Sequence, residues 1–235
     1  MIQYLRLSHS FNASALQKEV ALLEAAFWKE HYNKAHYQGE WTVLPLRSIQ
    51  GATDNIISVH GANHHHLAYS DTALLHHCPE IKQVLSFFNC EKTSVRLMKL
   101  AAGAIIHEHR DQEMSFEDGE VRFHIPITTN KNVAFYLEEE LIPMREGECC
   151  YLNLSLKHRV QNKGTQPRIH LVIDCLVNPW VTDLFTKQPN LVKYQDAAKE
   201  KKANPEEQAR IIQQLRLMNT AVSLKLADKL EKENR

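Results

Sequence analysis

The sequence predicts a mainly β fold, a barrel or sandwich with helical flanks. Residues 94–177 break into short runs rich in β-branched and aromatic residues, punctuated by Gly, Asn and Pro. The segments on either side carry helical periodicity instead. A chain of 235 residues is of normal size for a single barrel or sandwich. We therefore expect one β-rich core with helical additions at both ends.

The chain divides into three parts on these signals. Residues 1–93 alternate helix and strand patterns, and we expect them to pack on the core as an N-terminal α/β elaboration. Residues 94–180 form the core. Residues 181–235 comprise a polar, Lys-rich linker followed by an amphipathic helix.

Three elements are predicted in the N-terminal part. Ser14 and Gln17 match a capping box, which indicates the start of a helix. Apolar residues at helical spacing follow: Leu16, Val20, Leu23 and Phe27. WTVLPLR (41–47) is typical of a strand, and residues 78–88 of a short helix with Pro79 at its first position.

The core consists of six predicted strand runs. They are residues 94–103, 119–128, 132–140, 147–154, 157–164 and 167–177. Their spacing, with a turn signal between neighbours, suits antiparallel strands of a barrel or sandwich.

The C-terminal helix is predicted over residues 205–232. Asn204 is placed to cap its N-terminus, and two glutamates in the first turn match the helix dipole. One apolar stripe runs along it: Ile211, Leu215, Met218, Val222, Leu226 and Leu230. A helix this long is marginal in water unless that stripe is covered. Packing on the same chain and a homodimer through this helix both remain open.

Composition excludes several classes of protein. Lys plus Arg and Asp plus Glu each number 28, so no net charge favours nucleic acid or an anionic membrane. No apolar run is long enough for a membrane span, and the N-terminus lacks a signal-peptide core. Five cysteines without a C-x-x-C motif fit a reduced, cytoplasmic protein. The fourteen histidines invite metal chemistry, although the runs at 64–66 and 76–77 are interpreted as loop histidines that diverge in direction.

GAIIHEHRD (103–111) places His107, His109 and Asp111 at alternate positions. On a β-strand such side chains share a face, so all three are candidate metal ligands. Two histidines and one carboxylate hold Fe(II) while leaving positions open for a cosubstrate and oxygen. His109 and Asp111 form the H-x-D part of that set, and His158, at the start of a predicted strand, is the best candidate for the second histidine.

Arg168 stands ten residues beyond His158, on the next predicted strand. We expect it to point into the barrel, where a buried arginine needs an anionic partner. The carboxylate of a cosubstrate, bound by the planar guanidinium, is a natural one. H-x-D alone arises often by chance, but H-x-D with a distal His and this Arg among short strands is a specific combination.

A cupin-type metal-binding protein is the alternative. Its ligands would be His107, His109, Glu113 and His158. The gap from Gly103 to His107 is four positions instead of that family's six, and the Pro-x-Gly that should precede the distal histidine is missing. The cupin hypothesis also assigns no role to Arg168, which we expect to be buried.

Three segments resemble a known family: RLMKLAAGAIIHEHRD (96–111), VRFHIPITTN (121–130) and LNLSLKHRVQNKGTQPRIHLVIDCLVN (152–178). They are similar to the aspartyl/asparaginyl β-hydroxylases, a family of Fe(II)- and 2-oxoglutarate-dependent dioxygenases. The resemblance is closest to the bacterial stand-alone branch, which includes enzymes that cis-hydroxylate free L-proline. It implies a double-stranded β-helix (jelly-roll) core.

The resemblance also implies roles for single residues. The iron ligands would be His109, Asp111 and His158. The cosubstrate site would contain Arg168, Arg122, His124 and Met98. Arg168 would bind the far carboxylate of 2-oxoglutarate, with Arg122 and His124 holding the cosubstrate from the facing side. His107 occupies a position that the family does not use as a ligand.

The implied activity uses Fe(II), 2-oxoglutarate and O₂ to hydroxylate an unactivated C–H bond, with release of succinate and CO₂. The substrate would be an amino acid, an amino-acid-like small molecule or a peptidyl residue. Arg96 is a candidate to pair with an amino-acid carboxylate, and a surface or edge-strand arginine is the equal alternative.

Overall fold

The computed structural model describes residues 1–23, 25–59, 67–189, 191–193 and 205–217, together with residues 224, 228 and 231. The chain separates into two compact units, Met1–Lys193 and Tyr194–Arg235. Among the described residues, every strand belongs to the first unit.

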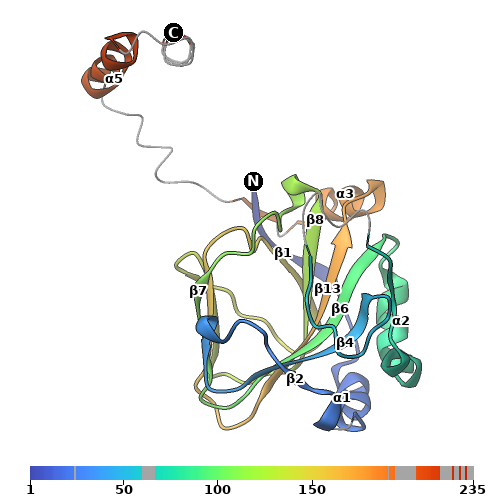
Figure 1. Cartoon of the computed structure of the whole chain (residues 1–235). Coiled ribbons are helices and arrows are strands. Elements are labelled where there is room, and N and C mark those ends of the chain that lie inside the picture. The colour runs from blue at the N-terminus through green and yellow to red at the C-terminus, as the bar shows by residue number, and fades with distance from the viewer. Residues whose placement is uncertain are drawn as a thin grey trace. The chain divides into compact units, whose positions relative to one another are not determined.

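Two antiparallel sheets form the first unit (Figure 1). Within the described residues, the large sheet has nine strands. In spatial order they are β14 (Leu191–Lys193), β1 (Ile2–Ser10), β11 (Glu148–Leu152), β8 (Glu120–Thr128), β13 (Arg168–Leu176), β6 (Lys92–Leu100), β4 (Trp41–Ile49) and β2 (Lys29–Glu30), with β5 (Tyr69–Asp71) paired to β4. The small sheet runs β10 (Glu140–Leu141), β9 (Val133–Leu137), β12 (His158–Asn162), β7 (Ile105–His109) and β3 (Tyr37–Gln38). This arrangement confirms the mainly β, jelly-roll prediction.

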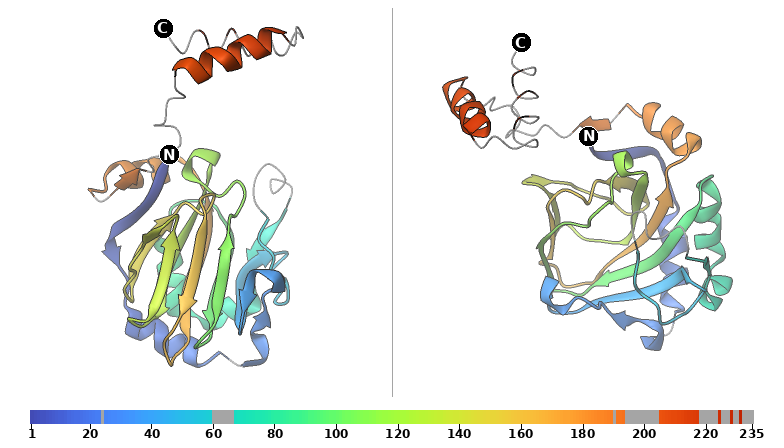
Figure 2. Two further views of the ribbon diagram at one scale, coloured as in Figure 1. Left: turned by 90° about the vertical axis from the view of Figure 1, so that its left-hand side faces the viewer. Right: turned by 45° about the horizontal axis from the view of Figure 1, so that its top comes forward.

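Helices cover the outer face of the large sheet, the face turned away from the small sheet (Figure 2). These helices are α1 (Ala13–Ala21), α2 (Pro79–Phe87) and α3 (Pro179–Thr186). The second unit contains a helix of its own, α5 (Pro205–Leu217). Short 3₁₀ turns are η1 (Ala25–Phe27), η2 (Lys34–His36), η4 (Ala73–His77) and η5 (Phe116–Asp118). The predicted strand at 41–47 and the predicted helix at 78–88 are confirmed as β4 and α2.

Two helix starts differ from the sequence prediction. The capping box of Ser14 and Gln17 is wrong, because Asn12 caps α1 and its Oδ1 accepts from the Ala15 N–H at 3.1 Å. Helix α3 was not predicted, although Asn178 caps it in front of a proline at its first turn. The same Asn-Pro signal, at Asn204 and Pro205, predicts the start of the C-terminal helix.

The six predicted core runs all form strands, and three of them position the site. Along β6, β8 and β13, alternate residues pack outward into one apolar cluster with α1 and α2. These outward residues include Val95, Leu97, Val121, Phe123, Ile125, Leu171 and Ile173. The intervening residues face the small sheet, and many are buried and polar: Arg96, Arg122, His124, Arg168, His170 and Asp174.

The C-terminal helix is described over Pro205–Leu217. The stripe residues Met218, Val222, Leu226 and Leu230 lie outside the described residues, and the pairing of this helix with a second copy stays a prediction. Arg216 forms ion pairs with Asp228 and Glu231 at 3.0 and 2.9 Å. In the described part of the chain, no helix has the length and apolar character needed to cross a membrane.

Candidate functional site

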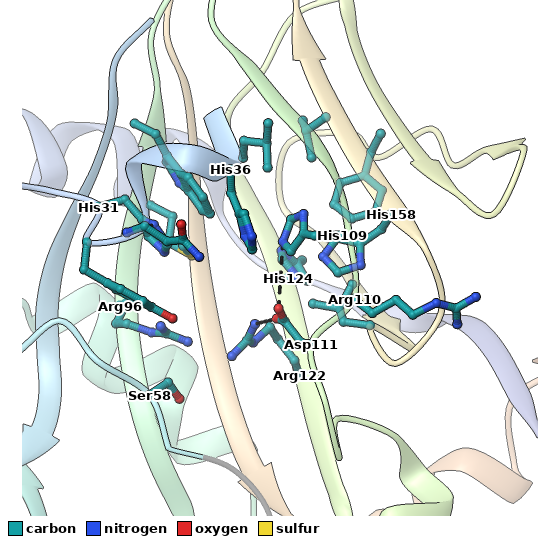
Figure 3. A pocket seen from close by; sticks show the side chains of 18 of the residues that line it. His31, His36, Ser58, Arg96, His109, Arg110, Asp111, Arg122, His124 and His158 are labelled. Atoms are coloured by element: carbon teal, nitrogen blue, oxygen red, sulfur yellow. Dashed lines mark hydrogen bonds and ion pairs between the residues drawn. The ribbon is translucent and has the colours of Figure 1, made fainter. Parts of the chain in front are cut away.

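Three potential metal ligands converge at the end of the small sheet (Figure 3). His109 ends β7 and lies directly opposite His158, the first residue of the neighbouring β12. Asp111 follows β7, and its backbone N–H is held by the Leu154 carbonyl at 2.8 Å. One ligand atom from each of the three side chains lies within 4.8 Å of the others. The structure thus brings the predicted His-x-Asp and distal His together.

Hydrogen bonds to the backbone orient both histidine rings. Nδ1 of His109 lies 2.8 Å from the His107 carbonyl, and Nδ1 of His158 lies 3.0 Å from the Leu156 carbonyl. A carbonyl only accepts, so Nδ1 carries the proton and Nε2 keeps its lone pair for a metal. Burial, the largest effect, lowers the pKa of His158 to about 4, which keeps the ring neutral near pH 7.

A β-bulge decides which histidine of the H-x-H-x-D run faces the other ligands. His109 pairs with His158, but Ile106 pairs with Val160, so β7 has one extra residue between these pairs. The extra residue breaks the simple alternation along the strand. His107 therefore turns to solvent and is exposed, while His109 points inward.

Arg122 connects the ligand Asp111 to a buried carboxylate. Its Nη1 donates to Asp111 Oδ2 at 2.5 Å, while Nε and Nη2 donate to Asp174 Oδ1 and Oδ2 at 2.5 and 2.9 Å. Asp174 is fully buried on β13. Burial alone lowers the pKa of Arg122, but the adjacent Asp174 and Asp111 carboxylates outweigh it and raise that pKa above its ordinary value.

Arg96 reaches the same buried carboxylate from β6. Its Nη2 donates to Asp174 Oδ2 at 2.7 Å, and the Ser58 hydroxyl donates to that oxygen at 2.6 Å. Burial lowers the pKa of Arg96, with Asp174 opposing the shift. Arg96 is 4% exposed and lines the cavity, so the alternative of a surface arginine does not describe its position.

Arg168 is buried without an acidic partner among the described residues. Its Nη2 donates to His170 Nδ1 at 2.8 Å, and its Nε is buried with no hydrogen-bond partner in that part of the chain. Burial lowers the pKa of Arg168 to about 9. Both ring nitrogens of nearby His124 are likewise buried without a described partner. An unpaired guanidinium in such a place is costly, so the site fits an incoming carboxylate.

A cavity of about 420 Å³ joins these groups. The predicted residues on its wall are Arg96, Met98, His109, Asp111, Arg122, His124, His158 and Arg168. Figure 3 shows His31, Arg96 and Ser58 on the side of the cavity opposite His109 and His158. The donor set of two imidazoles and one carboxylate fits Fe(II), and the buried arginine fits the acid end of 2-oxoglutarate.

Residues 10–178 match the sequence profile of the aspartyl/asparaginyl β-hydroxylases. This match spans well over half of the chain. The chain belongs to the aspartyl/asparaginyl β-hydroxylase family. The resemblance found in the sequence is thereby confirmed.

Individual relatives of this hydroxylase-family chain are distant. An L-proline cis-4-hydroxylase of Rhizobium meliloti (strain 1021) is 25% identical over 166 residues, which cover 70% of this chain and 57% of the relative. The chain thus spans little more than half of that protein's length.

Two solved structures share part of the architecture. A prolyl-4-hydroxylase of Pseudomonas putida has a TM-score of 0.47 at 10% identity, covering 76% of this chain and 94% of its own. An oxidoreductase of the 2OG-Fe(II) oxygenase family from Burkholderia pseudomallei also scores 0.47, at 11% identity, covering 73% and 85%. These likenesses are too remote to bear on activity.

Several cavity residues of this family member had no role in the sequence prediction. His31 stacks on Trp41 at 3.6 Å between ring centroids, and burial lowers the pKa of His31 to about 3. The ring centroid of His36 lies 5.0 Å from that of His109. No local pattern marks these histidines. Asp174, which lies outside the cavity lining, did carry a signal: it is a single acid in the apolar run HLVIDCLV, and a buried charge requires partners.

Proposed function

We propose that the protein is an Fe(II)- and 2-oxoglutarate-dependent dioxygenase that hydroxylates an unactivated C–H bond of a small amino-acid-like substrate. The observation that carries this proposal is the convergence of His109, Asp111 and His158 in a cavity that is also lined by the buried Arg168, which has no acidic partner among the described residues. Membership of the hydroxylase family supports it.

The metal would be held by His109 and His158 through Nε2 and by Asp111 through a carboxylate oxygen. Three protein ligands on one side leave the remaining coordination positions for cosubstrate and oxygen. Bound iron, with 2-oxoglutarate and O₂, would supply the oxidising power for hydroxylation, and succinate and CO₂ would be released.

The cosubstrate would be held by Arg168, whose planar guanidinium can form two parallel hydrogen bonds to a carboxylate. His124 and Met98 line the same cavity from β8 and β6 and would contact the rest of the molecule. Because these side chains are buried, they would also keep bulk water away from the reacting centre. Arg122 lies on the cavity wall as well, with three of its N–H groups directed at Asp111 and Asp174.

The substrate would be a free amino acid or a close analogue with a carboxylate. Arg96 lies on the cavity side opposite the metal ligands. Its Nη2 is bonded to Asp174, and its Nε is buried without a partner among the described residues, so Nε is the group that could bind the carboxylate. A cavity of about 420 Å³ must hold both cosubstrate and substrate, which favours a small molecule over a long peptide. The relative named as an L-proline cis-4-hydroxylase is consistent with this class.

The test is succinate formation from 2-oxoglutarate by the full chain with Fe(II), screened against free amino acids and, in parallel, the same residues within short peptides. We expect at least one free amino acid to stimulate succinate formation and to gain one oxygen atom by mass. Stimulation by peptides alone would overturn the substrate class. No iron-dependent turnover of 2-oxoglutarate with any of them would overturn the dioxygenase proposal.

The cupin alternative would require His107 and Glu113 as ligands. Both are exposed, and among the described residues neither belongs to the group of converging ligand atoms. A His107→Ala variant separates the two hypotheses, because a dioxygenase should keep its metal and at least part of its activity.

A further inference from the structure

Asp174 is a buried carboxylate that is neither a proposed metal ligand nor part of the cavity lining. Asp174 is 0% exposed, and among the described residues its carboxylate accepts four hydrogen bonds from the side chains of Arg122, Arg96 and Ser58. A buried carboxylate is costly unless it is paired and hydrogen-bonded, so this cluster is unlike the apolar packing on the other face of β13.

The hydrogen bonds of Arg122 define how the ligand carboxylate is presented. Arg122 Nη1 holds Asp111 Oδ2 at 2.5 Å, and Asp111 Oδ1 lies 3.8 Å from His109 Nε2. The oxygen nearer to the imidazole is therefore Oδ1, and the guanidinium holds the other. Oδ1 is thus the oxygen presented toward His109, while Oδ2 is bonded to Arg122.

The position of Arg122 in turn depends on Asp174. A long arginine side chain has many rotamers, and two parallel N–H···O bonds to one carboxylate select a single one. The two residues are direct partners across neighbouring strands, since Arg122 on β8 pairs with Asp174 on β13. The strand register thus delivers the guanidinium to Asp111.

We propose that Asp174 is a positioning residue for the metal centre, which acts through Arg122 to direct one oxygen of Asp111 to the metal and withhold the other. Oδ2 of Asp174 also accepts a hydrogen bond from Arg96. One carboxylate therefore orients both Arg96, on the proposed substrate side of the cavity, and Arg122, which holds Asp111. The inference rests on the metal centre of the proposed function and adds to it the device that orients its carboxylate ligand.

The test measures metal affinity without turnover, by titrating the purified full chain with Co(II) and following the ligand-field absorption. Removal of an outer partner of a metal ligand typically weakens metal binding about 10- to 100-fold. We expect a loss in this range for Asp174→Asn, which keeps the shape and removes the charge. Arg122→Lys should lose Co(II) affinity to a similar extent, because an ammonium group cannot bridge two carboxylates as the planar guanidinium does.

Glu19→Gln is the matched control. Glu19 is also a buried carboxylate, and it accepts from the N–H groups of Glu80 and Ile81 at the start of α2, away from the cavity. This variant should lose stability, judged by its melting temperature, and bind Co(II) as the wild type does. Equal weakening of Co(II) binding in Glu19→Gln would assign the effect to general destabilisation and overturn the proposal.

The remaining outcomes are also decisive. Wild-type affinity in folded Asp174→Asn would overturn the role of Asp174 even if Arg122→Lys binds weakly. If Asp174→Asn does not fold, Arg122→Lys decides, and wild-type affinity there overturns the inference. A wild-type chain that binds no Co(II) would remove the metal centre and the proposed function together. A chain that binds Co(II) in an Asp174-dependent way but fails to turn over 2-oxoglutarate would overturn only the proposed function.

Discussion

Along the strands β6, β8 and β13, the outer and the inner face of the large sheet differ in chemistry. On β13 the outward residues Leu171 and Ile173 enter the apolar cluster under α1 and α2. The inward residues of the same strand include Arg168, His170 and Asp174, which are buried and polar, with the apolar Val172 between them. Strand alternation alone separates the two sets.

This difference teaches that burial serves two purposes in this fold. On the outer face, removal of apolar surface from water stabilises the chain. On the inner face, burial strengthens interactions between charges. Arg168 is buried there without an acidic partner among the described residues, which supports its proposed role in binding a carboxylate. Substitutions on the outer face should therefore change stability, whereas those on the inner face should change binding and chemistry.

The largest effect is expected for a proposed metal ligand. Asp111→Ala should reduce iron-dependent succinate formation to background and leave the fold intact, because one of three protein ligands is lost. His107→Ala is the control, since this exposed residue should be dispensable for at least part of the activity. Turnover and bound iron are measured for both. An equal loss of iron in the two variants would favour the cupin hypothesis instead.

Leu171→Ala tests the outer face. Leu171 is fully buried, and truncation of such a residue lowers the free energy of unfolding by about 2–5 kcal/mol. Urea denaturation measures this loss. Activity per folded molecule should stay near the wild-type value at a temperature well below the melting point. A fall in turnover without a fall in stability would break the separation of the two faces.

Arg168→Lys tests the cosubstrate side of the inner face. Lysine keeps the charge but lacks the planar fork, so we expect a loss of about 1.5–3 kcal/mol in 2-oxoglutarate binding, the range for hydrogen bonds to charged groups. This equals an increase of about 10- to 150-fold in the KM for 2-oxoglutarate. Iron affinity should change less. An unchanged KM would remove Arg168 from the cosubstrate site.

The smallest effect concerns pH. The pKa of His31 falls from 6.5 to about 3 on folding, because burial disfavours its charged form. As the pH falls below 6.5, His31 takes up a proton in the unfolded chain but stays neutral in the folded chain. The free energy of unfolding therefore falls as the pH decreases from 6.5 toward 3. Each such group adds a slope of about 1.4 kcal/mol per pH unit within this window.

His31→Phe preserves a flat ring against Trp41 and removes the titration. The free energy of unfolding, measured by urea denaturation between pH 4 and 5.5, should then depend less steeply on pH by up to about 1.4 kcal/mol per unit. Leu171→Ala is the matched control from the outer face, and it should lower the whole curve without changing its slope. An unchanged slope in His31→Phe would contradict the neutral, buried state of the ring.

Much of the architecture was accessible from local sequence patterns. The runs 94–103 and 167–177 alternate and end at turn signals, and both form strands of the large sheet. Pro79 starts α2 as predicted. The sequence predicts Ser14 as the N-cap of α1, whereas Asn12 caps the helix. Several residue types can cap a helix, and which of them does so depends on where the preceding strand ends.

The H-x-D motif, the distal histidine and the arginine ten residues on were all recognisable in the sequence, because each is a short pattern tied to strand alternation. The tertiary structure decided that His109 and not His107 faces the cavity, since the bulge in β7 arises from its register with β12. It also joined Arg122 to Asp174, 52 positions apart, and brought Ser58 to the same carboxylate. Such contacts depend on strand register and global packing, which no local preference of the chain encodes.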